Sequence, residues 1–245
     1  TLSSNLDGEI NSGTIASFIS KFNQDGTKEW TKLTGGSWST ANALTVASDG
    51  SIYIAGKDKD NIDGEINSGN YDAYLSKFNP DGTKEWTRLL GTSSNESGEA
   101  LTTGLDGSIY ITGYTNGDLD GQTNSGSYDA FISKYNADGT KDWTRLLGSS
   151  NNELGQALTT GSDGSIYIAG VTSGDLDGQT NSGYKDAFIS KFNPDGTKEW
   201  TRLLGSSRED YADALTTGSD GSIYIAGTTG GDLDGQNLNG GINQI

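Results

Sequence analysis

The residues best suited to chemistry in this sequence are carboxylates and amides in a recurring, glycine-containing loop. One copy of the loop contains Asp118, Asp120, Gln122, Asn124 and Asp129, so that oxygen-bearing side chains alternate along a short stretch of chain. A hard cation such as Ca²⁺ takes roughly six to eight oxygen ligands of this kind. Asp, Asn and Gly are also ordinary turn formers, because their side chains or conformations satisfy the local backbone. The loop therefore predicts either a calcium site or a purely structural turn.

The spacing of the acids is close to that of a helix–loop–helix calcium motif, with carboxylates at loop positions one, three and twelve. The glycine stands at position four instead of six, and the flanking segments are expected to be strands. We expect the three internal copies to bind best. The predicted calcium ligands are Asn61, Asp63, Asn67, Asp72, Asp118, Asp120, Asn124, Asp129, Asp175, Asp177, Asn181, Asp186, Asp232 and Asp234.

A second set of acids, Glu96, Glu153 and Asp210, recurs at matching positions of another loop. Two carboxylates can hydrolyse a glycosidic bond when one acts as an acid and the other as a base or nucleophile. Such a pair needs two different environments, whereas these acids repeat with the symmetry of the chain. We therefore expect no catalytic residues, and predict that these acids bind loop amides or share an ion.

Tryptophans recur at Trp30, Trp86, Trp143 and Trp200. A ring of such residues would stack sugars in a multivalent lectin, but large aromatic residues more often pack between structural units, and packing is the interpretation that we favour. Trp38 occurs once, in a loop, and is predicted to be an exposed anchor or a plug. The predicted binding residues are therefore Trp38, Glu96, Glu153 and Asp210.

The composition excludes several classes of function. The chain has 245 residues, 33 acids against 16 bases, a net charge of −17, and no His, Cys or Met. It therefore has no Ser-His-Asp triad, no Cys nucleophile and no imidazole or thiolate metal site. The negative charge argues against nucleic acid, which is bound through cations that neutralise phosphates. The sequence contains no run of about 20 apolar residues, so we expect no segment that spans a membrane.

The elements that position these residues are repeated. The octapeptide DGSIYIAG begins at Asp49 and returns, with one substitution in the second copy, from Asp106, Asp163 and Asp220, each time after 57 residues. Four such periods account for nearly the whole chain, without a linker. A fixed period of this size indicates a repeat architecture.

One period contains four predicted strands, at residues 157–161, 165–170, 186–192 and 198–204. Their two-residue alternation and β-branched or aromatic residues favour strands, and Asp-Gly pairs mark hairpin turns. The predicted fold is all-β. Four short antiparallel strands per period describe the blade of a β-propeller; an open β-solenoid is the alternative.

The order of the predicted strands suggests how the ring closes. The chain opens with strands three and four of a blade and ends with strands one and two. We predict a single four-bladed domain over 1–245, closed by pairing of N-terminal with C-terminal strands: half-blade 1–42, blades 43–99, 100–156 and 157–213, and half-blade 214–245. The alternative is pairing of these ends with other chains, which gives a larger ring or a filament.

The stretch GSYDAFISKYNADGTKDWTRLLGSSNNELGQALTTGSDGSIYIAG resembles the SBBP-type β-propeller repeat of bacterial proteins. The resemblance extends over nearly the whole chain. It implies a propeller fold and an extracellular or cell-surface setting, without implying one activity.

From these observations we expect a non-enzymatic, extracellular propeller that binds calcium and serves as an adhesion or structural interaction module. Its expected partners are a surface protein or a polysaccharide, with self-assembly through open strand ends as a further expectation. A multivalent carbohydrate-binding lectin is the alternative, and a carboxylate-dependent polysaccharide hydrolase is a remote one.

Overall fold

The computed structural model describes residues 5–11 and 13–238, and these residues form β-strands joined by turns and loops. Thus no helix in the described part of the chain is long and apolar enough to cross a membrane. The strands are β1 (Ser17–Phe22), β2 (Lys28–Thr34), β3 (Ser39–Val46), β4 (Ile52–Asp58), β5 (Asp72–Phe78), β6 (Lys84–Leu90), β7 (Glu96–Thr103), β8 (Ile109–Thr115), β9 (Asp129–Tyr135), β10 (Lys141–Leu147), β11 (Glu153–Thr160), β12 (Ile166–Thr172), β13 (Asp186–Phe192), β14 (Lys198–Leu204), β15 (Asp210–Thr217) and β16 (Ile223–Thr229).

The described strands form antiparallel sheets that follow the period of the sequence. Three sheets have four strands each, β3–β6, β7–β10 and β11–β14, and are called here the first, second and third sheets. Two sheets have two strands each, β1–β2 and β15–β16, and are called the end sheets. The prediction of an all-β chain with four-stranded antiparallel sheets is therefore confirmed.

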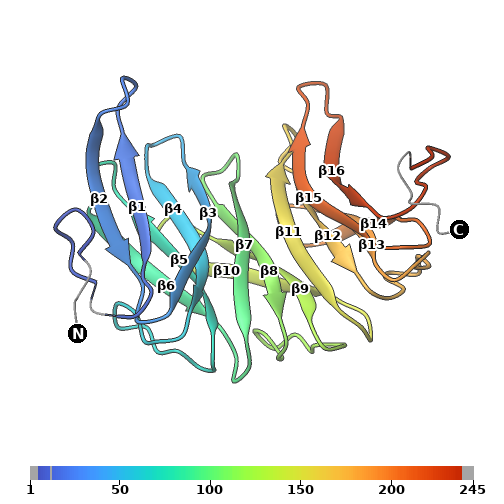
Figure 1. The fold of residues 1–245 in the computed structure, drawn as a ribbon, viewed down its shortest axis with the longest axis horizontal. Coiled ribbons are helices and arrows are strands. Elements are labelled where there is room, and N and C mark those ends of the chain that lie inside the picture. The colour runs from blue at the N-terminus through green and yellow to red at the C-terminus, as the bar shows by residue number, and fades with distance from the viewer. Residues whose placement is uncertain (1–4, 12, 239–245) are drawn as a thin grey trace, which may run out of the picture.

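The predicted closure of the ring is not formed among the described residues. The strand β1 pairs with β2 and β16 pairs with β15, and the two end sheets lie at opposite ends of an open array (Figure 1). The angle between neighbouring sheets is set by the side chains that pack between them, such as those of the cluster that joins the first sheet to the second. In the described residues this packing does not bring β16 beside β1, which corrects the sequence prediction of a ring closed by the N-terminal and C-terminal strands.

The third and fourth strands of the period begin where the sequence predicted, as in β13 and β14. The first strand is longer than predicted, since β11 begins at Glu153 and not at Ala157. A bulge between Gly155 and Ala157 shifts the register of β11 against β12. A bulge inserts an extra residue and interrupts the two-residue alternation, which conceals the start of the strand.

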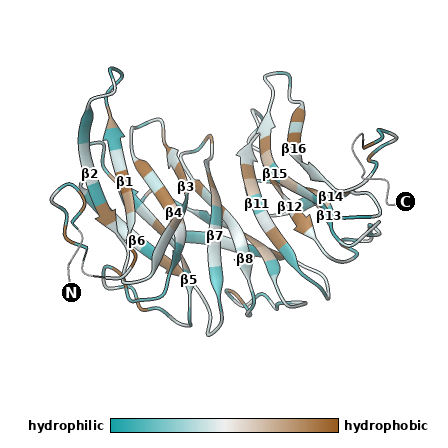
Figure 2. Cartoon of the chain, in the orientation of Figure 1, coloured by the Kyte–Doolittle hydropathy of each residue, from teal (hydrophilic) through white to brown (hydrophobic). Residues whose placement is uncertain are grey.

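The core lies between neighbouring sheets. Tyr53, Ile109, Ile111 and Phe131 belong to one buried cluster that joins the first sheet to the second, and a related cluster joins the second to the third. Figure 2 shows hydrophobic residues on the strands and hydrophilic residues in most turns and loops. Burial of these large side chains is the main source of stability.

Hydrophobic residues of the end sheets are more exposed than their counterparts. Phe18 is 57% exposed and Tyr224 is 59% exposed, whereas their counterparts Phe131 and Tyr110 are 0% and 1% exposed. In the complete sheets both positions are covered by a neighbouring strand or sheet. The end sheets therefore present open edges and apolar faces.

Candidate functional site

The loops predicted to bind calcium are tied to the outer strand of their own sheet. Asp120 adopts a positive φ of 52° in the tight turn, and its carboxylate forms an ion pair with Lys141 and accepts a hydrogen bond from the Thr144 hydroxyl. The corresponding contacts join Asp63 to Lys84 and Thr87, and Asp177 to Lys198 and Thr201. These contacts fix the loop after each second strand against the sheet.

The remaining predicted ligands also have structural partners. The Asp118 carboxylate accepts the Asn124 backbone N–H at 2.9 Å, and the Asn124 side chain donates to the Thr115 carbonyl at 3.0 Å. Asp175 and Asn181 repeat this pattern, as do Asn61 and Asn67. Asp232 accepts the Leu238 N–H at 2.8 Å, and Asp234 has a positive φ of 48°. Over residues 5–11 and 13–238, no three Asp or Glu side chains gather in a group that could hold a metal ion.

The last predicted calcium ligand of each internal loop does not lie with the other ligands of that loop. It lies instead beside an acid of the second set. Asp72, Asp129 and Asp186 begin the third strands and are fully buried, and Glu96, Glu153 and Asp210 begin the following first strands with at most 1% exposed. We call the three resulting pairs, Asp72/Glu96, Asp129/Glu153 and Asp186/Asp210, the first, second and third joints. They lie where one sheet passes into the next.

At the second joint, Glu153 binds the loop that precedes it, as predicted. Its carboxylate accepts hydrogen bonds from the Ser149 N–H at 2.5 Å, the Ser149 hydroxyl at 2.7 Å and the Thr172 hydroxyl at 2.7 Å. Glu96 has the same partners in Thr92 and Thr115. These two glutamates hold the preceding loops in place through hydrogen bonds, so their role here is structural.

Burial raises the pKa of the joint acids Asp72, Asp129, Glu96 and Glu153, and the neighbouring Asp raises the pKa of each Glu further. An acid whose pKa is higher in the folded chain stabilises the fold when protonated, and this contribution is lost as the pH rises through the folded pKa. In EDTA, we therefore expect the melting temperature to rise as the pH is lowered from 7 toward the ordinary carboxyl pKa range of about 4.

Further acidification should reverse that rise. Hydrogen bonds from serine backbone N–H groups lower the pKa of three turn aspartates below the ordinary 3.8, namely Asp49, Asp163 and Asp220. The stability that these ionised aspartates contribute is therefore lost only in stronger acid. Thermal melts monitored by circular dichroism across this range test the prediction. A melting temperature that falls steadily from pH 7 downward, with no rise before the loss in strong acid, would contradict it.

The tryptophans of the repeat pack between sheets, which is the interpretation preferred from the sequence over sugar stacking. The Trp143 ring lies 5.9 Å from the Tyr110 ring, and its Nε1 donates to the Pro194 carbonyl of the next sheet at 3.1 Å. Trp38 is 44% exposed, and its backbone forms a parallel bridge with Ile15. It corresponds in the repeat to Asn152, which lines the pocket described next.

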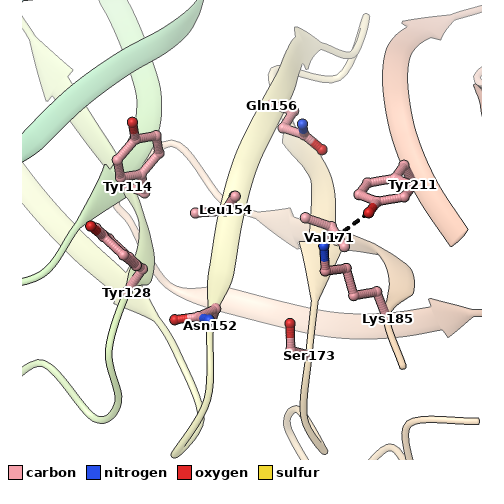
Figure 3. Close-up of a pocket in the computed structure, with 9 residues that line it drawn as sticks. All are labelled: Tyr114, Tyr128, Asn152, Leu154, Gln156, Val171, Ser173, Lys185 and Tyr211. Atoms are coloured by element: carbon pink, nitrogen blue, oxygen red, sulfur yellow. Dashed lines mark hydrogen bonds between the residues drawn. The ribbon is translucent and has the colours of Figure 1, made fainter. Parts of the chain in front are cut away.

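A pocket of about 380 Å³ spans the third sheet, from the second sheet to the β15–β16 end sheet (Figure 3). Tyr114 and Tyr128 form one side with their rings edge to face, 5.4 Å apart. On the other side, the Lys185 ammonium donates to the Tyr211 hydroxyl at 2.9 Å. The lining is completed by Asn152, Leu154, Gln156, Val171 and Ser173. The Gln156 Oε1 is buried without a hydrogen-bond partner.

Most of the positions at which all four repeats differ line the pocket. Five positions of the period carry a different residue in each of the four copies, and four of these line the pocket in at least one copy. The four sets are Thr40, Ser97, Leu154 and Tyr211; Asn42, Glu99, Gln156 and Asp213; Lys57, Tyr114, Val171 and Thr228; and Lys59, Asn116, Ser173 and Gly230. Exposure alone does not account for this variation, because exposed turn residues such as Thr83, Thr140 and Thr197 are identical.

Sequence reasoning missed this pocket because it followed what the copies share. Of the predicted binding residues, Trp38 lies outside the pocket, and Glu96, Glu153 and Asp210 lie in the joints. A comparison of the copies with one another contains the missing signal, since it separates a largely constant frame from five fully variable positions, four of which line the pocket.

Comparisons with known proteins agree with the repeat and with the fold. Residues 85–120 and 199–234 match the SBBP beta-propeller repeat, and residues 47–85 and 105–144 match a beta-propeller domain of unknown function, DUF5122. The regulatory protein FlaEY of Caulobacter vibrioides is 30% identical over 197 residues, which cover 70% of this chain and 20% of that protein. This chain thus spans about a fifth of the length of that relative.

A crystal structure of a protein of unknown function from Bacteroides caccae is also similar. It superposes with a TM-score of 0.51 at 11% identity, covering 85% of this chain and 61% of that one. At this level of identity the similarity concerns the fold alone.

Proposed function

Because this chain belongs to the β-propeller repeat proteins of the SBBP type, we propose that it is a non-enzymatic interaction module of the cell surface that binds carbohydrate in the pocket of the third sheet. The observation that carries this proposal is the concentration of repeat-to-repeat differences at the pocket. The frame that every copy needs for folding varies little, while the side chains offered to a ligand differ in every copy.

The chemistry of the lining favours a polyhydroxylated ligand. The Tyr114 and Tyr128 rings offer apolar faces with polar tips, which suit the C–H face of a sugar ring. Asn152, Gln156 and Ser173 supply amide and hydroxyl groups for sugar hydroxyls, and the free Gln156 Oε1 is an acceptor in need of a donor. The volume of about 380 Å³ lies in the range of small-ligand pockets and suits a mono- or disaccharide unit.

The acids of the chain support binding over hydrolysis. A glycosidase needs an acid and a base that reach the substrate, whereas Glu96 and Glu153 are fully buried and bonded to loop groups. The pocket lining contains no Asp or Glu among the described residues. The relative named as a regulatory protein is consistent with a role in recognition.

Two further properties are proposed for this chain, calcium binding and pairing with another repeat. Calcium binding by the internal loops remains a prediction, and the open edges of β1 and β16 suit pairing with another repeat of this type. In that arrangement Phe18 and Tyr224 would be covered as their counterparts are in the complete sheets.

Carbohydrate binding is tested by a glycan array, followed by calorimetric titration of the best ligand. We expect Tyr128→Ala to weaken binding at least tenfold, which corresponds to about 1.4 kcal/mol, because it removes one wall of the pocket. Tyr71→Ala is the matched control: Tyr71 holds the same position one period earlier, outside the pocket. Equal losses in both variants, or no glycan bound by the unmodified chain, would overturn the proposal.

A further inference from the structure

The three joints differ in one respect that the symmetry of the chain conceals. At the first and second joints the second acid is glutamate, and its long side chain reaches a threonine hydroxyl of the adjacent strand, Thr115 or Thr172, at 2.7 Å. Both oxygens of each glutamate thereby have hydrogen-bond partners. At the third joint the second acid is Asp210, which is shorter by one methylene group.

The shorter side chain leaves one oxygen without a partner. The Ser206 N–H and hydroxyl both donate to Asp210 Oδ2, at 2.6 and 2.9 Å, and Asp210 Oδ1 is buried with no partner. Thr229 contacts the Gly231 carbonyl at 2.9 Å, as its counterparts Thr115 and Thr172 contact the corresponding glycine carbonyls, but it has no bond to the acid. The contact between acid and threonine that closes the other joints is not formed here.

The first acid of the same joint adds a second such oxygen, and the first acids Asp72 and Asp129 each have one at the other two joints as well. Asp186 Oδ2 accepts the Ser182 N–H at 2.8 Å, while Asp186 Oδ1 is buried without a partner. The Asp186 carboxylate lies directly against Gly205, where an added Cβ would be 2.1 Å from its carbon. Since Ser206 follows Gly205 and binds Asp210, the two carboxylates flank one Gly-Ser pair.

The third joint therefore holds two buried carboxylates, 0% and 1% exposed, each with one free oxygen. Within the described residues neither carboxylate forms an ion pair with Lys or Arg. Asp210 and Thr229 also border a cavity of about 130 Å³, which is large enough to hold water. Buried charge that is neither paired nor neutralised is strongly unfavourable.

We propose that the third joint binds one hard divalent cation, Ca²⁺ or Mg²⁺, through Asp186 Oδ1 and Asp210 Oδ1. The Thr229 hydroxyl and water in the adjoining cavity are further oxygen ligands of the kind that these cations take. The site combines Asp186, predicted from the sequence as a loop ligand, with Asp210, predicted for a separate binding set. It does not depend on the carbohydrate pocket.

The experiment is a calorimetric titration of the full chain, stripped with EDTA, with CaCl₂ and separately with MgCl₂. We expect one cation per chain. Asp210→Glu should bind none, because the longer side chain would reach Thr229 as it does at the other joints, and its melting temperature in EDTA should be at least that of the unmodified chain. Glu153→Asp should gain a second site, because it recreates the short acid opposite Thr172.

Other results would overturn the proposal. These are an unmodified chain that binds no cation at millimolar concentrations, or Asp210→Glu that binds as the unmodified chain does. Binding of several calcium ions that is lost in Asp120→Asn plus Asp177→Asn and kept in Asp210→Glu would place the cations in the loops. The melting temperatures of all variants in EDTA show that each one is folded.

Discussion

Gly113→Ala is expected to lower the free energy of unfolding by at least about 3 kcal/mol, beyond the typical cost of overpacking. Gly113 lies in β8 opposite Gly98 of β7. A Cβ at this position would lie 1.8 Å from the Ser97 carbonyl oxygen and 2.9 Å from its carbon. Because both atoms belong to the backbone of the neighbouring strand, no side chain can move aside, and the two strands would have to separate.

The matched control is Gly121→Ala, in the loop after β8. Gly121 has a φ of 74° and no atom within 4 Å of the added Cβ, so the cost there is backbone strain alone, about 1–2 kcal/mol. Urea denaturation followed by tryptophan fluorescence gives both values. Equal denaturation midpoints for the two variants would show that β7 and β8 tolerate separation.

The second large effect is expected for Trp143→Ala, which should lower the free energy of unfolding by about 3 kcal/mol. This is the lower end of the range for removal of a large aromatic side chain. The ring of Trp143 packs on Gly196 in a turn of the third sheet, where an added Cβ would be 2.8 Å from it. The Arg145 guanidinium lies 5.5 Å from the Trp143 ring, and its Nε donates to the Gly196 carbonyl at 3.0 Å. Loss of Trp143 thus removes packing within the second sheet and between the second and third sheets.

Trp38→Ala serves as the comparison because Trp38 is 44% exposed, and a surface change of this kind alters stability by only about 0.5 kcal/mol. Chemical denaturation of both variants, monitored by far-ultraviolet circular dichroism, distinguishes the two roles. A similar loss of stability in both variants would mean that Trp143 does not couple the sheets.

The local structure was predictable wherever sequence pattern and turn chemistry agree. β13 and β14 follow from their alternation and from the Asp-Gly turn between them, in which Asp195 accepts the Thr197 N–H at 2.8 Å. The start of β11 did not follow, because the bulge at Gly155 interrupts the alternation. The open arrangement of the end sheets was not predictable, because the angle between sheets depends on side-chain packing across them.

The candidate sites were predictable only in part, for a related reason. The sequence identifies the acids of the loops but not their partners: Asp120 is paired with Lys141, and Asp129 is buried beside Glu153. Those partners lie 21 and 24 residues away in the chain. The pocket draws on three sheets, and only the folded chain brings Tyr114, Gln156 and Lys185 to one surface.

The contacts between sheets have one further consequence, for how such a chain changes in evolution. Lys77, Trp86 and Arg88 of the first sheet all reach the turn between β9 and β10 in the second, and Lys134, Trp143 and Arg145 repeat this toward the third. Each sheet thus recognises only its immediate successor, as in other repeat arrays. Loss or gain of a whole 57-residue period through recombination between near-identical gene segments would join the same two surfaces again. The length of the array can therefore change without a new interface, while the side chains of individual pockets diverge by point mutation.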